Sequence, residues 1–196
     1  MKKLSLFVTA VALFSFVACN NTKKDTLQEE SNVEEFDPAP DLDEDTPERV
    51  IHVIMDSKSG SNVTGEFYFT EKDGQVQMEG KLSGLTKDAH AIHLHENGDC
   101  SGDDGMAAGG HWNPTNHAHG EWDHDDGYHK GDIGNLNPDE NGNVAVKFET
   151  DQWCIGCGDP EKDIIGKSII VHADEDDFTT QPTGNAGARI ACGVIR

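Results

Sequence analysis

From Val50 to the C-terminus, short strand-like runs alternate with turn residues. Seven runs have the apolar or alternating pattern of β-strands: 50–55, 63–69, 76–82, 91–95, 144–148, 169–172 and 190–195. Asp73-Gly74 and Asn141-Gly142 are typical hairpin turn sequences. No segment among them keeps the 3.6-residue apolar period of an amphipathic helix. The sequence therefore predicts an all-β fold, an antiparallel sandwich or barrel.

Two long stretches, 97–143 and 173–188, do not have the strand pattern and are rich in Gly, Asn and Asp. Long loops on a compact β domain are usually functional or disordered. The first contains four residues that could bind a metal, and the second begins directly after His172. We therefore expect the functional site to involve both loops.

Seven residues with metal-binding side chains form the candidate site: His93, His95, His111, His119, His129, Asp132 and His172. His93 and His95 are two residues apart on a predicted strand, so they share one face and can bind one ion. The number of imidazoles exceeds what one tetrahedral ion needs and is right for two.

The candidate ligands divide into a loop set and a strand set. Structural zinc sites are tetrahedral, and the three ligands from 119–132 together with His111 would complete one. The three strand histidines leave a tetragonal copper site one ligand short. If His111 serves both ions through one ring nitrogen each, both sets close.

The motifs around these residues resemble copper–zinc superoxide dismutase, in the family's order, from about residue 50 to residue 196. They are His93-Leu94-His95-Glu96-Asn97-Gly98-Asp99-Cys100, Gly110-His111-Trp112-Asn113-Pro114, His119-Gly120, His129-Lys130-Gly131-Asp132-Ile133-Gly134-Asn135, Val171-His172-Ala173 and Gly184-Asn185-Ala186-Gly187-Ala188-Arg189-Ile190-Ala191-Cys192-Gly193. The resemblance implies a Greek-key, immunoglobulin-like sandwich or barrel with two functional loops. It also implies disproportionation of superoxide to O2 and H2O2, with one copper and one zinc per subunit. The family uses more than one interface, so both a homodimer and a monomer stay open.

The resemblance also assigns roles to residues. It implies the copper ligands His93, His95, His111 and His172 and the zinc ligands His111, His119, His129 and Asp132, with His111 bridging. Arg189 would bind the anionic substrate beside copper, and Asp176 would join a copper-ligand to a zinc-ligand histidine. Cys100 and Cys192 would form the family's disulfide. A non-catalytic metal buffer is the alternative, but such a relative is expected to lose a copper-side histidine or the arginine, and both are present.

Some potentially reactive residues match no motif of the family. For Cys154 and Cys157 we expect a small structural disulfide, since disulfides persist in exported proteins; a copper or thiol-redox role is the alternative. Four further histidines match no ligand position, and we expect them to be simply packed or solvated: His52, His90, His117 and His124.

The N-terminal 48 residues predict export and anchoring. Lys2 and Lys3 precede an apolar run over 4–17, which is typical of a signal peptide covering 1–18. The run ends in Ala18-Cys19, which resembles a bacterial lipobox, so we expect lipidated Cys19; ordinary signal cleavage is the alternative. Residues 19–48 carry net charge −9 and read as a flexible acidic tether before a domain over 49–196. These features predict location in the cell envelope or periplasm, with membrane contact through the lipid only; the family resemblance implies that the protein there is an enzyme of antioxidant defence.

The domain over 49–196 has net charge −15. This argues against nucleic acid and against electrostatic docking on anionic lipid. It also opposes the attraction of superoxide, an anion, and there is no Lys or Arg between His172 and Arg189. Any attracting field must then come from Arg189, the metals, and Lys130 or Lys167. We expect slower and less salt-sensitive catalysis than in relatives with lysine-lined channels.

Overall fold

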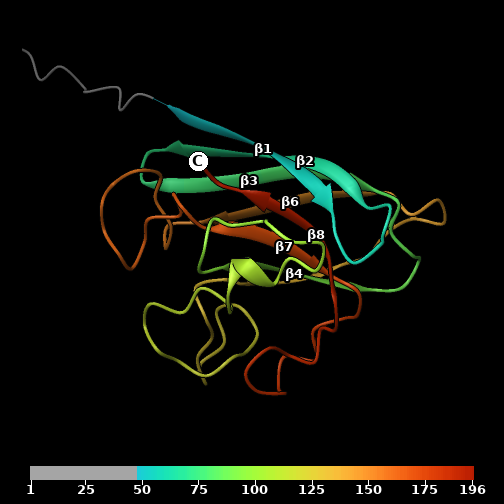
Figure 1. Cartoon of the computed structure of the whole chain (residues 1–196). Coiled ribbons are helices and arrows are strands. Elements are labelled where there is room, and N and C mark those ends of the chain that lie inside the picture. Colours follow the sequence, from blue (N-terminus) through green and yellow to red (C-terminus); the bar gives the residue numbers. More distant parts are fainter. Residues whose placement is uncertain (1–47) are drawn as a thin grey trace, which may run out of the picture. The chain divides into compact units, whose positions relative to one another are not determined.

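The computed structural model describes residues 48–196. The predicted signal peptide, Cys19 and the tether up to residue 47 lie outside the described residues. Eight strands and one short 3-10 helix make up the domain (Figure 1): β1 Arg49–Ser57, β2 Thr64–Lys72, β3 Gln75–Ser83, β4 His90–His95, η1 Met106–Ala108, β5 Asp132–Leu136, β6 Val144–Thr150, β7 Ser168–His172 and β8 Arg189–Val194. In the described part of the chain, no helix has the length and apolar character needed to cross a membrane.

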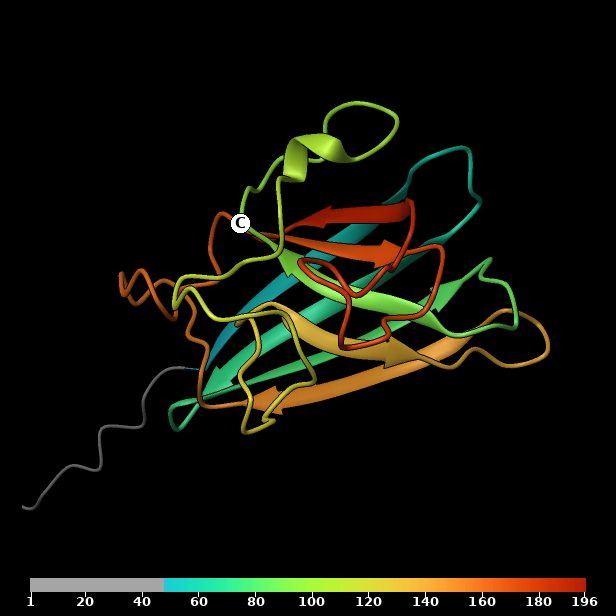
Figure 2. The same cartoon turned by 90° about the horizontal axis from the view of Figure 1, so that it is seen from below.

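The strands form one antiparallel sheet in the order β5-β4-β7-β8-β1-β2-β3-β6. β1 joins its two halves, because it pairs with β2 along most of its length and with β8 only at Asp56 and Ser57. The sheet curls until its ends, β5 and β6, approach each other (Figure 2). The pairings of β3 with β6 and of β4 with β7 are Greek-key crossings. The predicted antiparallel barrel is therefore confirmed.

The core follows from strand alternation. On β2, Phe67 and Phe69 point inward and are fully buried, while Tyr68 between them is exposed. Gly80 on β3 leaves room for one of these rings, because a Cβ there would collide with Phe67. Every residue of β4 is buried. One face of β4 packs in the core and the loops cover the other, and that covered face carries His93 and His95.

One strand was missed. The stretch 97–143 was expected to contain no strand, but Asp132–Leu136 forms β5 and pairs with β4. Its five residues include only two large apolar side chains, Ile133 and Leu136, so the pattern is too weak to detect. The strand forms because β4 offers it a partner, which is a tertiary contact.

Candidate metal centre

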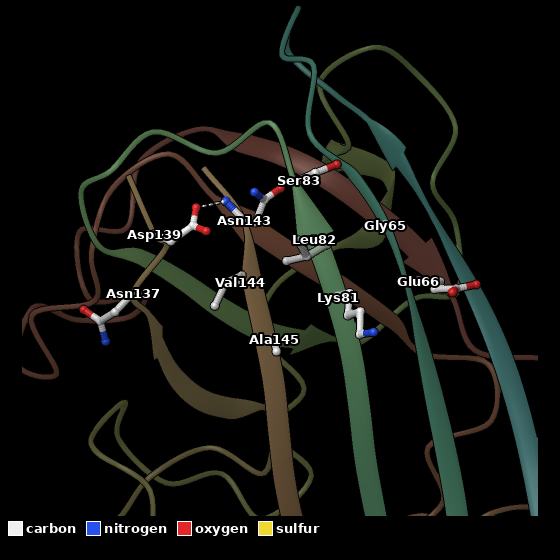
Figure 3. Close-up of a pocket in the computed structure, with 10 residues that line it drawn as sticks. All are labelled: Gly65, Glu66, Lys81, Leu82, Ser83, Asn137, Asp139, Asn143, Val144 and Ala145. Atoms are coloured by element: carbon white, nitrogen blue, oxygen red, sulfur yellow. Dashed lines mark hydrogen bonds between the residues drawn. The ribbon is translucent and has the colours of Figure 1, made fainter. Parts of the chain in front are cut away.

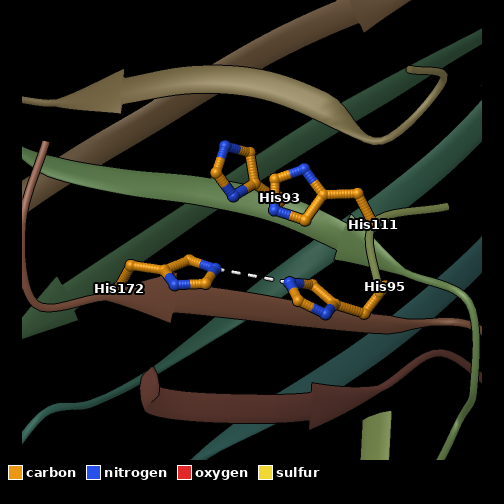
Figure 4. A group of neighbouring side chains, drawn as sticks. All are labelled: His93, His95, His111 and His172. Carbon is orange, nitrogen blue, oxygen red and sulfur yellow. Dashed lines mark hydrogen bonds between the residues drawn. The ribbon is translucent and has the colours of Figure 1, made fainter. Parts of the chain in front are cut away.

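Four histidines from distant parts of the chain meet on the face of β4 that points away from the hydrophobic core. Ile92 and Leu94 belong to the core, so His93 and His95 point away from it, toward the loops. His172 ends the neighbouring strand β7, and His111 forms an isolated bridge with His95. Figure 4 shows the four rings facing one another. All four are buried, and one donor atom from each lies within 4.8 Å of the others.

The hydrogen bonds of His95 and His172 leave their inner nitrogens without protons. Nδ1 of His95 donates to the carbonyl of Gly109 at 2.9 Å, and Nδ1 of His172 donates to that of Gly187 at 3.4 Å. The two Nε2 atoms then face each other at 3.3 Å as bare lone pairs (Figure 4). Two acceptors cannot satisfy each other, but a cation bound by both would.

The other two histidines present free nitrogens to the same space. Nε2 of His93 donates to Oδ2 of Asp176 at 2.8 Å, which leaves its Nδ1 buried and unpartnered. Nε2 of His111 is also buried and unpartnered. Buried polar atoms almost always have partners, so these orphaned nitrogens fit a metal site.

A second set surrounds the carboxylate of Asp132, which begins β5. Nδ1 of His111 lies 2.8 Å from it. Nδ1 of His119 and of His129 lie at 2.9 and 3.2 Å, without the alignment of a hydrogen bond. The four donor atoms again lie within 4.8 Å of one another. His111 thus belongs to both sets, with Nδ1 turned toward Asp132 and Nε2 toward the other histidines.

The carboxylate of Asp176 connects the two sets. It is 2% exposed; Oδ2 accepts from His93, and Oδ1 accepts from Nε2 of His119, both at 2.8 Å. The side chain of Asn135 on β5 holds the backbone of Asp176 through two hydrogen bonds. Such outer carboxylates fix the orientation and tautomer of metal-binding imidazoles.

Burial and charge set the protonation of the two groups differently. Burial, together with neighbouring imidazoles, holds the pKa values of His95 and His172 well below 6.5, and burial lowers the pKa of His111 to about 4. Burial would also lower the pKa of His119, but the adjacent carboxylates of Asp132 and Asp176 raise it to about 9. At neutral pH the rings of His95, His111 and His172 are therefore neutral, whereas His119 must release a proton to bind a cation.

The carboxyl of Asp132 is anionic throughout the physiological range. Burial opposes its charge, but the hydrogen bond from His111, the nearby imidazoles of His119 and His129 and a backbone N–H outweigh burial and bring its pKa far below 3.8. Oδ2 also accepts the backbone N–H groups of Gly120 and His129 at 3.2 and 2.8 Å. Asp132 therefore organises the loop over 119–132, hereafter the ligand loop, as well as offering an anionic donor.

The sequence that carries these two clusters matches a known protein family. The family model described as copper/zinc superoxide dismutase (SODC) matches residues 63–195. The chain belongs to this family. Solved structures agree: a SOD-like protein from Bacillus subtilis is 31% identical, with a TM-score of 0.66, covering 74% of this chain and 97% of that one. A double mutant of such a protein from the same organism is 33% identical, also with a TM-score of 0.66, covering 74% and 95%. The clock protein EA4 is 33% identical, with a TM-score of 0.65, covering 74% and 92%.

In this copper/zinc dismutase domain, one hollow reaches the His95–His172 pair from outside. Its volume is about 480 Å³, and Asp104 and Arg189 also line it. The guanidinium of Arg189 is fixed by the carbonyls of Gly105 and Gly109, at 2.7 and 2.6 Å. Among the described residues that line the hollow, Arg189 carries the only permanent positive charge.

Two disulfides are present. Cys100 is bonded to Cys192, which joins the loop carrying Gly105 and Gly109 to β8. Cys154 is bonded to Cys157 in the connection between β6 and β7. Neither pair takes part in the two histidine clusters.

Sequence reasoning missed the contribution of His90. Its ring is buried, Nδ1 donates to the carbonyl of His172 at 2.8 Å, and Nε2 is 2.8 Å from the hydroxyl of Thr86. His90 therefore fixes the backbone of His172, a member of the four-histidine cluster, without facing that cluster. Its partner is a main-chain carbonyl, which leaves no mark in a sequence. The other unmatched histidines, His52, His117 and His124, are exposed.

A larger hollow of the described domain lies elsewhere, beside β3 and β6, with a volume of about 910 Å³ (Figure 3). Leu82 and Val144 line it together with amides and a few charged groups. It contains no histidine or cysteine, and its Asp139 accepts the backbone N–H groups of Asn141 and Asn143 in a turn. Size alone thus does not mark the functional site.

Proposed function

We propose that this protein is an active superoxide dismutase that uses copper and zinc. The observation that carries the proposal is the shared residue His111, whose two ring nitrogens face two separate, complete donor sets. A fold that only needed packed histidines would have no reason to leave four buried nitrogens without partners.

The donor chemistry supports one copper and one zinc. Four imidazole nitrogens, from His93, His95, His111 and His172, suit copper. Three imidazoles and the carboxylate of Asp132 suit a closed zinc site. When bound, copper supplies the one-electron chemistry that converts two superoxide ions to O2 and H2O2, and zinc supplies no redox chemistry.

Protein groups bind the substrate and handle protons. Arg189 offers a planar cation beside His95 and His172, held by two carbonyls so that it need not reorganise to bind a small anion. His111 can hold a proton on Nε2 and give it up there, which supplies one of the two protons in H2O2. The carboxylate of Asp132, 2.8 Å from Nδ1 of the same ring, favours the protonated form.

The surroundings of the hollow support a modest rate of substrate capture. Asp104 lies in the same hollow as Arg189 and opposes its charge. Neither Lys130 nor Lys167 lines it: Lys130 bonds to Gln152, and Lys167 bonds to the carbonyl of Glu96. Together with the net charge of −15, this supports slower and less salt-sensitive turnover than in relatives with lysine-lined channels.

For location, we propose export and anchoring through lipidated Cys19, with residues 20–48 as the tether in the cell envelope. The support is the sequence pattern of residues 1–19 alone. Fractionation of cells that express the wild type and Cys19→Ala tests it. Release of the variant from membranes is expected, and an unchanged distribution would refute the anchor.

Metal analysis and a superoxide assay of the purified full-length protein test the enzymatic proposal. We expect about one copper and one zinc per chain, and loss of activity in His172→Ala with zinc retained. Zinc alone bound from an equimolar copper–zinc mixture, or full metal content without turnover, would favour the metal-buffer alternative. Activity that survives His172→Ala would place the chemistry elsewhere.

A further inference from the structure

An aromatic cluster ties the ligand loop to the barrel at a point away from the two histidine clusters. Trp122 lies in this loop, and its ring packs edge-on against Phe148 of β6, with centroids 4.8 Å apart. Trp153, just after β6, contacts both rings, edge-on to Trp122 at 5.8 Å and tilted against Phe148 at 5.1 Å. Tyr128 also packs against Trp122, with ring centroids 5.0 Å apart. Such aromatic pairs stabilise beyond the area they bury.

Three hydrogen bonds join the same two parts of the chain. The indole N–H of Trp153 donates to the carbonyl of Lys130 at 2.8 Å. The ammonium of Lys130 donates to the side chain of Gln152 at 3.0 Å, and the amide of Gln152 donates to the hydroxyl of Tyr128. Lys130 directly follows His129 and lies two residues before Asp132. The hydrogen bond from Trp153 therefore holds the backbone between two residues of the zinc-side donor set.

The barrel side of this contact is rigid. Trp153 is 1% exposed and belongs to the hydrophobic core. The next residue, Cys154, is bonded to Cys157, and its backbone exchanges hydrogen bonds with Lys162 and Ile164. Trp153 is therefore fixed whether or not a metal is bound nearby.

The middle of the ligand loop has little else to hold it to the barrel. Between Gly120 and Gly127, every residue except Trp122 is exposed, and four of those residues are acidic. Like charges extend a chain rather than fold it. Trp122 is thus the apolar anchor of this segment.

We propose that Trp122, Tyr128, Phe148, Gln152 and Trp153 form a clamp that positions the ligand loop for zinc before zinc binds. The inference rests on the zinc site of the proposed function. A loop ordered in advance loses less conformational entropy on binding, so the clamp strengthens zinc binding without touching the ion. The five residues are positioning residues, not ligands.

Zinc affinity of the metal-free, full-length protein tests the clamp, measured by competition with a chromophoric chelator at fixed pH. Trp153→Phe keeps an aromatic ring but removes the N–H that bonds to Lys130, together with part of the indole's packing. It should weaken zinc binding by at least about 2- to 10-fold, the range for one lost hydrogen bond. Trp122→Leu should weaken it about 10-fold or more, because two aromatic contacts with the barrel are lost. Phe67→Leu, a core change on β2 away from the clamp, should leave it unchanged. Wild-type affinity in both clamp variants would overturn the proposal.

Amide hydrogen exchange in the metal-free protein separates failure of the clamp from failure of the zinc site. Exchange over 120–131 should be faster in Trp122→Leu and Trp153→Phe than in the wild type and Phe67→Leu, whatever the protein binds. If the wild type binds no zinc but the four proteins differ in exchange as expected, the zinc assignment is wrong and the clamp stands. Identical exchange in all four proteins would refute the clamp.

Discussion

Removal of the Cys100–Cys192 disulfide should destabilise the domain far more than removal of Cys154–Cys157. Both disulfides restrict the unfolded chain, and the loop-closure entropy they remove grows with the length of chain they enclose. The first spans 92 residues and the second 3. Loop closure then predicts losses of about 4.6 kcal/mol for Cys100→Ala/Cys192→Ala and about 1.6 kcal/mol for Cys154→Ala/Cys157→Ala.

The long-range disulfide should also affect the site. It holds the loop whose carbonyls at Gly105 and Gly109 orient Arg189. Without the disulfide, that loop is tied to β8 by fewer contacts and Arg189 loses its fixed position. We therefore expect the Cys100/Cys192 variant to lose superoxide turnover even when folded and metal-loaded, whereas the Cys154/Cys157 variant should keep it.

Urea denaturation of the metal-free proteins, followed by circular dichroism at neutral pH, measures both losses. Each variant replaces two cysteines by alanine and removes one disulfide, so each is the control for the other. A difference of about 3 kcal/mol between them is expected. Equal losses, or a smaller loss for the long-range pair, would refute the loop-closure reasoning. Normal turnover in the Cys100/Cys192 variant would refute the role given to the loop in orienting Arg189.

Three further changes test the site. Asp176→Asn should weaken zinc binding about 10- to 100-fold, because the carboxylate that orients His119 is lost; chelator competition measures this, and exposed Glu175→Gln is the matched control. The metal-free protein should be most stable near pH 6.5, as denaturation midpoints from pH 4 to 9 would show. Stability falls as the pH rises from 6.5 to about 9, because folding raises the pKa of His119. It also falls as the pH drops from 6.5 toward about 4, because folding lowers the pKa of His111. A flat profile would contradict this. Asp104→Asn should raise kcat/KM about twofold at low ionic strength and less at high salt, because one opposing charge leaves the hollow; an unchanged rate would mean that Asp104 does not affect substrate capture.

The barrel and the ligand faces could be predicted because they follow local rules. Alternation along a strand puts His93 and His95 on one face, and short runs between turns indicate an antiparallel sheet. The five residues of β5 could not be found this way, because that strand exists only where β4 pairs with it. Tertiary pairing decides such weak segments.

The contacts that orient the site were largely invisible in the sequence. The carbonyl of Gly109 fixes both His95 and Arg189, but a carbonyl belongs to every residue and has no signature. Trp122 stands in an acidic loop that reads as solvated. Its partners Phe148 and Trp153 reach it only because the chain leaves β6 beside the ligand loop.

His111 and Asp176 each touch both donor sets, so the two sites share two separate physical connections. Any change in the affinity of one site that follows occupancy of the other must then be reciprocal, because a coupling free energy has one value whichever ion binds first. The protein cannot favour copper after zinc without equally favouring zinc after copper. The order in which a cell supplies the metals would set how fast the loaded form is reached, but not how stable it is.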